Sequence, residues 1–136
     1  MKILSNTAIG THEDCITKCA KTPLKPSQLV ALDASDPKGV NPSSSSSIPF
    51  GVASDEAAAG EIVNVDLLGC SNTLHIRAGA SIAAGALLIP GANGTVLPMP
   101  TSAGTYSCIG LALSSAANGA EVEVLTSLPY QHKITA

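Results

Sequence analysis

The alternation of apolar and polar residues is clearest between residues 74 and 98. Leu-His-Ile-Arg at 74–77 alternates as a half-buried strand does. The apolar run 86–89 predicts a second strand, and Pro90-Gly91 stops it. Asn93-Gly94 predicts a tight turn, because both residue types tolerate positive φ. Residues 95–97 then return as a further strand, so this stretch consists of strands and turns.

The same order of strands and turns occurs twice when the chain is aligned with itself. The matched pairs of segments are 24–31 with 82–89, 51–53 with 110–112, 57–60 with 116–119, and 63–65 with 122–124. This alignment predicts an internal duplication with halves at about 23–69 and 74–128. We therefore expect an all-β protein: a small β-barrel or β-clip-like domain over 23–136.

The alignment also predicts how the strands are connected. Paired inner strands are expected at 48–54 and 108–113, and short connections at 55–59 and 114–117 have the composition of a single helical turn. The serine run Ser43–Ser47 reads as a flexible loop that corresponds to 99–106 in the second half. The alternation around Glu121 and Glu123 predicts a strand with one wet face, and Pro129 is expected to end the sheet.

Residues 1–22 do not fit the repeat, and they end just before Pro23. The segment is polar and mixed, with isolated apolar residues. Three interpretations remain open: an extended N-terminal arm that reaches a neighbour, a first strand that pairs with the sheet, or a frayed terminus.

The composition points to a small core that needs support. A chain of 136 residues fits one domain, but it has one Phe, two Tyr and no Trp. The core must then consist of Ala, Val, Leu and Ile, of which each buried Val or Leu contributes roughly 1.5–3 kcal/mol. Association with copies of itself, or with a larger assembly, would supplement such a core.

Charge and hydropathy exclude two classes of partner. The net charge is −3 with 12% charged residues, and no basic stripe is interleaved with aromatic side chains, so we expect no nucleic acid partner. No apolar run approaches the length of a membrane span, and 1–4 is too short for a signal peptide. The expectation is a soluble protein made in a cytoplasm, with no membrane partner.

The cysteines predict reduced thiols without a metal. The spacing His12-x2-Cys15-x3-Cys19 offers three ligand types, with Cys70 or Cys108 as a fourth, but structural zinc sites usually have a second closely spaced pair. No metal and no other cofactor is expected.

Residues suited to catalysis are sparse. Glu121 and Glu123 share the wet face of a strand, and His75 lies on the polar side of its strand. The other acidic pairs are Asp33 with Asp36 and Asp55 with Glu56. The serines include no nucleophile elbow, and the glycine turns include no phosphate-binding loop. We therefore expect a structural or binding protein and not an enzyme.

The order of small-residue motifs over about 24–128 resembles the tailed-phage capsid cement (head decoration) proteins. The motifs are Arg77-Ala78-Gly79, Gly85, Asn93-Gly94, Ile109-Gly110-Leu111-Ala112 and Gly119-x-Glu121-Val122-Glu123-Val124. Residues 59–61 match only loosely, and the serine run and the arm 1–22 are unusual. The resemblance implies a structural virion protein that binds the outer surface of an icosahedral phage head as a homotrimer and stabilises it. Its partners would be the major capsid protein and itself, after synthesis in the host cytoplasm.

A second interpretation comes from Ala-Gly-x-x-Ile-x-x-Gly-x-Leu at 78–87, which is similar to clip-type β folds. It implies a ligand-binding or enzyme accessory domain instead.

On the cement interpretation, the arm 1–22 is the expected contact with the capsid. Its spaced apolar residues Ile3, Leu4, Ile9 and Ile16 suit a chain that lies along a groove or adds a strand to an edge. Deletion of 1–17 is then expected to leave the barrel folded and to weaken capsid occupancy about tenfold.

Overall fold

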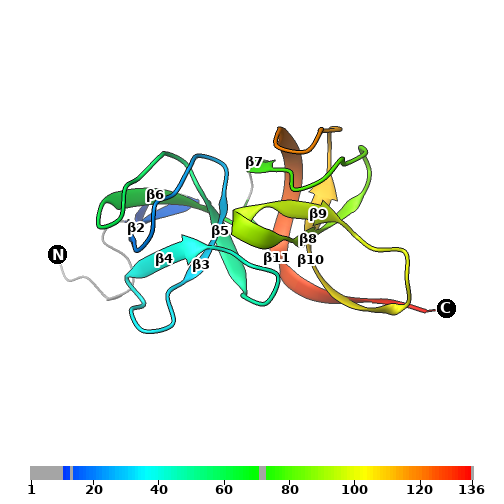
Figure 1. Ribbon diagram of the computed structural model, residues 1–136, viewed down its shortest axis with the longest axis horizontal. Coiled ribbons are helices and arrows are strands. Elements are labelled where there is room, and N and C mark those ends of the chain that lie inside the picture. Colours follow the sequence, from blue (N-terminus) through cyan, green and yellow to red (C-terminus); the bar gives the residue numbers. More distant parts are fainter. Residues whose placement is uncertain (1–10, 13, 71–72, 136) are drawn as a thin grey trace.

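The protein is built almost entirely from β-strands arranged in two sheets that lie side by side (Figure 1). The computed structural model describes residues 11–12, 14–70 and 73–135. None of the helices in these ranges is long and apolar enough to cross a membrane.

The first sheet closes on itself into a barrel, because β2 pairs with β4 on one side and with β6 on the other. Its order is β1-β2-β4-β3-β5-β6. Closure leaves the barrel strands without a free edge. The strands are β1 (Thr11–His12), β2 (Cys15–Ala20), β3 (Leu29–Leu32), β4 (Gly39–Pro42), β5 (Pro49–Ala53) and β6 (Ile62–Leu67).

The second sheet is a half-barrel of five strands in the order β7-β11-β10-β8-β9. The ends of its two longest strands, β10 and β11, continue past the sheet as a ribbon toward the C-terminal end (Figure 1). The elements are β7 (Leu74–Arg77), β8 (Leu87–Pro90), the 3-10 turn η1 (Ala92–Gly94), β9 (Val96–Pro98), β10 (Gly104–Ala112) and β11 (Glu121–Ile134).

Corresponding backbone hydrogen bonds recur in the two halves. The bridge between Leu24 and Ala57 has its counterpart between Ile82 and Ala116. The Ser27 amide donates to the Ala53 carbonyl at 2.9 Å, as the Gly85 amide does to the Ala112 carbonyl at 2.7 Å. Even the backbone strain is repeated, since Ser27 (φ 69°) adopts the positive φ of Gly85 (φ 89°). The two sheets therefore use the same scaffold of turns and bridges.

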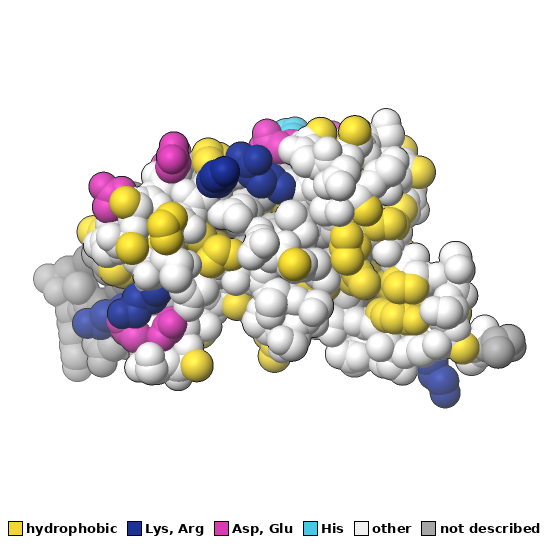
Figure 2. Space-filling model, viewed as in Figure 1, with side chains coloured by type: hydrophobic (Ala, Val, Ile, Leu, Met, Phe, Trp, Pro, Cys, Tyr) yellow, Lys and Arg dark blue, Asp and Glu magenta, His cyan; other side chains and the backbone are white. Residues whose placement is uncertain are grey.

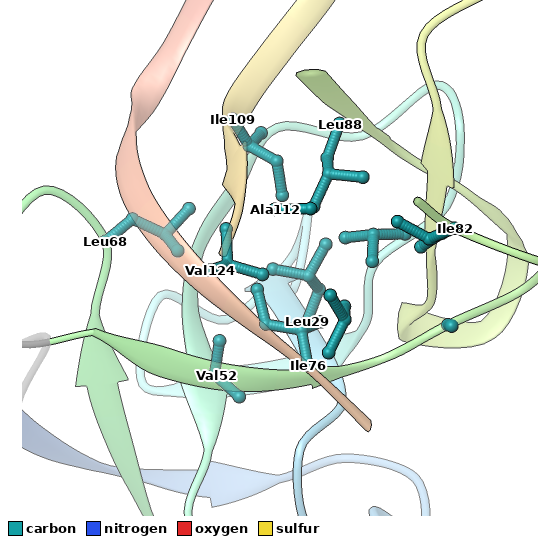
Figure 3. Packing of buried hydrophobic residues seen from close by; sticks show 12 residues of the cluster. Leu29, Val52, Leu68, Ile76, Ile82, Leu88, Ile109, Ala112 and Val124 are labelled. Atoms are coloured by element: carbon teal, nitrogen blue, oxygen red, sulfur yellow. The ribbon is translucent and has the colours of Figure 1, made fainter. Parts of the chain in front are cut away.

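The larger of two hydrophobic clusters joins the two halves (Figure 3). Leu29 and Val52 lie opposite each other on β3 and β5 and point out of the barrel, into the cluster lined by Ile76, Leu88 and Val124 of the half-barrel. The outer face of the barrel thus covers the open side of the half-barrel. A second cluster fills the barrel itself: Ala20, Leu24, Val30, Val40, Ala53, Ala57, Val63 and Val65.

The structure corrects the predicted N-terminal arm. Residues 15–20 form β2, which pairs with β6 over Cys15–Asp66 to Cys19–Ile62 and is a strand of the barrel. An arm outside the domain over 1–22 is therefore wrong for this segment, and the first half begins at β2. The duplication itself places Ile16 beneath Leu74, so β2 is the counterpart of β7.

Two further expectations are wrong for local reasons. β11 does not end at Pro129 but continues to Ile134. The register of β10 and β11 shifts between Cys108 and Gly110, so Pro129 falls where the ladder is interrupted and its missing N–H is tolerated. The segment expected to form one helical turn near Ala57 instead contributes the isolated bridge to Leu24.

The serine run forms a hydrogen-bonded turn instead of the expected flexible loop. The Ser47 hydroxyl accepts from the Ser44 amide at 2.8 Å and lies 3.2 Å from the Ser43 hydroxyl, which is buried. The Ser43 carbonyl accepts from the Gly94 amide at 2.7 Å, so this turn also ties the barrel to η1.

Candidate interaction surfaces

The predicted capsid-contact residues are only partly described. Ile3, Leu4 and Ile9 lie outside the described residues. Ile16 lies in β2 opposite Val65 and is half-buried against the barrel cluster. Its predicted contact with a capsid stays a prediction, but its side chain also serves the barrel.

The acidic residues and histidine singled out from the sequence lie at the junction of the two halves. The Ser27 hydroxyl donates to the Glu121 carboxylate, and the Arg77 guanidinium donates to the Pro26 carbonyl at 2.8 Å. Glu123 lies opposite His75 and accepts from the Thr73 hydroxyl at 3.0 Å. These contacts fasten β7 and β11 to neighbouring segments.

The other acidic residues stabilise a turn of the barrel. Asp33 accepts hydrogen bonds from Ser35 and Asn41, which lower the pKa of its carboxyl. Asp36 forms an ion pair of 2.9 Å with Lys21, and this partner lowers the pKa of Asp36. Asp55 and Glu56 are exposed. The acidic residues thus fall into separate surface groups.

The cysteines do not converge. Cys15, Cys19, Cys70 and Cys108 are free thiols, and burial raises the pKa of Cys70. In the described part of the chain, no three His, Cys, Asp or Glu side chains gather closely enough to hold a metal ion.

A hollow of about 720 Å³ is open to solvent and is lined by residues of the barrel and by Asn93 of the half-barrel. Gln28 in this lining accepts from the Lys25 amide at 2.8 Å and donates to the Asn93 carbonyl at 2.9 Å. Glu61 also completes a loop contact here, since it accepts from the Ala58 amide at 2.6 Å. The other charged residues of the lining, Lys25 and Glu56, are exposed.

A row of apolar side chains crosses the outer side of the half-barrel. Leu87, Leu111 and Leu125 lie directly opposite one another on β8, β10 and β11. Strand alternation and the pairing of β8 with β9 add further apolar residues to the same side. We call this surface the outer apolar face: Leu87, Ile89, Leu97, Met99, Leu111, Leu113 and Leu125.

The outer apolar face is accessible to a partner. Leu125 is 51% exposed and Leu113 is 44% exposed, and the remaining members are half-buried. Figure 2 shows hydrophobic side chains gathered over the half-barrel, while charged side chains are concentrated over the barrel and the junction. Beside this face, β7 and β11 present Arg77 opposite Glu121 as a polar rim. This arrangement is typical of a protein interaction surface.

Sequence reasoning missed this face, although a signal was present. The segments 87–89 and 111–113 each carry apolar residues on both sides of the strand, at the two outward positions as well as the inward one. A strand that is apolar on both sides is covered on both sides.

The comparisons with known proteins point to phage heads. A family model described as phage cement protein matches residues 10–128. Among solved structures, the chain is similar to the head fiber gp8.5 N base of bacteriophage phi29, at 23% identity and a TM-score of 0.68. The alignment covers 87% of this chain and 98% of that one, and at this identity it shows a shared fold. No curated protein matches the sequence.

Proposed function

The chain belongs to the phage cement protein family, and on that premise we propose that it binds the outer surface of an icosahedral phage head as a homotrimer and stabilises the shell. It is a structural protein of the phage head, associated with the virion. The proposal adds the outer surface, the trimer and the major capsid protein as partner, with synthesis in the host cytoplasm. No catalytic role and no cofactor are part of it.

The observation that carries the proposal is the family match over 10–128, which spans both halves of the duplicated fold. Two features support it. The buried residues of the two hydrophobic clusters include no Phe, Tyr or Trp, although the partly buried Phe50 packs against the barrel cluster. Added contacts to a shell or to copies would therefore reinforce a core of small side chains. The polar groups at the junction are engaged in contacts within the protein. Nothing in the described residues favours the clip-type ligand-binding alternative.

The proposed contact with the shell is the segment that precedes β2, with Ile3, Leu4 and Ile9 as apolar anchors. Ile16 then marks the base of this segment, where it joins the barrel. Apolar residues spaced along an extended chain fit a groove between capsid subunits.

Co-sedimentation with heads assembled without this protein tests the proposal. We expect saturable binding, and heads with bound protein should resist heat or low ionic strength better than bare heads. A variant with Ile3, Leu4 and Ile9 replaced by Ser should bind about tenfold more weakly, which corresponds to about 1.4 kcal/mol. Leu32→Ser, at an exposed apolar position of the barrel, is the control. Absence of saturable binding by the unaltered protein would contradict the proposal.

A further inference from the structure

The duplicated fold shows what covers the outer side of one of its sheets. In the barrel, the outward row is Leu29, Val52 and Asp66, which lie opposite one another on β3, β5 and β6. Leu29 and Val52 are buried in the cluster shared with the half-barrel. One repeat of this chain is therefore held to another through this row.

The half-barrel carries the corresponding row, which the described chain covers only in part. By the alignment of the halves, Leu87, Leu111 and Leu125 take the places of Leu29, Val52 and Asp66. At the next outward position Leu113 replaces Ser54. The second row is thus more apolar than the first, although Leu125 and Leu113 are 51% and 44% exposed.

We propose that the outer apolar face is the surface through which one copy of this chain contacts the others. The inference rests on the proposed homotrimer and assigns its interface. A second copy is the occupant that the structure favours, because the equivalent row is already used to join two repeats of this chain. Burial of exposed leucines would supply the driving force.

The charges support contact between like surfaces. A face near a symmetry axis meets copies of itself, so charged side chains there would repel one another. The outer apolar face contains none, and the nearest charged residue, Glu123, lies at its edge beside Leu113 and accepts from the Thr73 hydroxyl at 3.0 Å. The leucines of the face can therefore lie beside their own copies, with one carboxylate per copy left at the edge of the contact.

The halves themselves supply the test variant and its control. Leu113→Ser together with Leu125→Asp gives the half-barrel the residues of the barrel at the equivalent positions, Ser54 and Asp66. The control is Ile62→Glu, which replaces an exposed barrel residue (61%) by the residue that the half-barrel has there, Glu121. Leu125→Asp alone serves if the double variant loses its β-type circular dichroism spectrum.

Mass photometry and sedimentation velocity on the full-length protein without heads give the readout. We expect trimers for the unaltered protein and for Ile62→Glu, and a dissociation constant raised at least about tenfold for the double variant. Equal self-association of the double variant would overturn the inference. Normal self-association of the double variant together with a loss of head binding would also overturn it, because the face would then contact the shell.

Failure of the proposed function has a different signature. If the unaltered protein forms trimers through this face but never binds heads, the result supports the proposed interface and contradicts the cement function. If it binds heads but is monomeric at all concentrations, the result contradicts the proposed interface and supports head binding.

Discussion

At the scale of single residues, Lys18 is the least conventional member of the barrel core. It points inward from β2 at the position that Ile76 occupies in the half-barrel, and it is 1% exposed. Its ammonium donates to the Pro37 carbonyl at 2.7 Å, and burial lowers the pKa of Lys18 while Asp36 opposes this. A buried ammonium is costly, and an apolar side chain of similar length would avoid that cost.

We therefore expect Lys18→Met to raise the free energy of unfolding at pH 7 by on the order of 1 kcal/mol. Because the pKa of Lys18 is lower in the folded state, the wild type gains stability as pH rises through the folded pKa toward the unfolded value of 10.5. The difference in the free energy of unfolding between Lys18→Met and the wild type should therefore become smaller as the pH rises. Urea unfolding at pH 7 and pH 9.5 measures both effects, with exposed Lys25→Met as control. A variant less stable than the wild type at pH 7 would contradict this account of Lys18.

Gly51 and Gly110 occupy equivalent places in β5 and β10, and both lack room for a side chain. A Cβ on Gly51 would meet Val65 and the Asp66 carbonyl oxygen at 2.7 Å. A Cβ on Gly110 would meet the Leu125 carbonyl oxygen at 2.5 Å. These carbonyl oxygens belong to the backbone of the neighbouring strand, which cannot move aside easily.

Alanine at either glycine should lower the free energy of unfolding by about 1–3 kcal/mol through overpacking. Gly60→Ala is the matched control, since its Cβ would meet nothing within 4 Å and only its positive φ of 90° is strained. That strain costs roughly 1–2 kcal/mol, without any steric contact with a neighbouring strand. Thermal unfolding of the three variants compares them directly. Equal losses in the free energy of unfolding for alanine at Gly51, Gly110 and Gly60 would show that the close approach of the neighbouring strand does not cause the destabilisation.

At the scale of elements, β2 decides whether the barrel is closed. It contacts β4 at Cys19 and Ala20 and β6 from Cys15 to Cys19. Without it, β4 and β6 would each present an unpaired edge, and the interior around Lys18 would open to water.

Deletion of residues 1–17 should therefore unfold the barrel, in contrast to the expectation from sequence. The deletion removes the part of β2 that pairs with Asp66, Val65 and Asn64. Deletion of 1–10 is the control, since it spares both β1 and β2 and should keep a cooperative thermal transition. Circular dichroism melts distinguish the two truncations. A cooperative transition after deletion of 1–17 would mean that β2 is dispensable.

The alternation of apolar and polar residues predicted most of the strands, because each of these strands buries one face. Residues 74–77 match β7. The strands predicted at 86–89 and 95–97, on either side of the Asn93-Gly94 turn, match β8 and β9 to within one residue. A first strand in 1–22 was only one of three interpretations, because Lys18 interrupts the apolar positions at Ile16 and Ala20 in β2. Its counterpart β7 was recognised only because Ile76 keeps the alternation.

At the scale of the whole molecule, the duplication was readable but the pairing of its halves was not. Small-residue turns repeat in sequence, because each half needs the same backbone conformations. Nothing in a linear pattern states that one sheet closes while the other stays open, or that Leu29 and Val52 point out of the barrel into a shared cluster. The outer apolar face was missed for the same reason, since it depends on which side of each sheet is already covered.

The central claim concerns where this fold acts, and a reconstruction of heads tests it most directly. Heads assembled with and without the protein should be compared by electron cryomicroscopy. We expect the difference map to show trimers of the barrel and half-barrel on the outer surface, with the outer apolar faces around each threefold axis and the segment before β2 against the shell. A difference map without density on the outer surface, from heads that contain the protein in stoichiometric amounts, would contradict the claim.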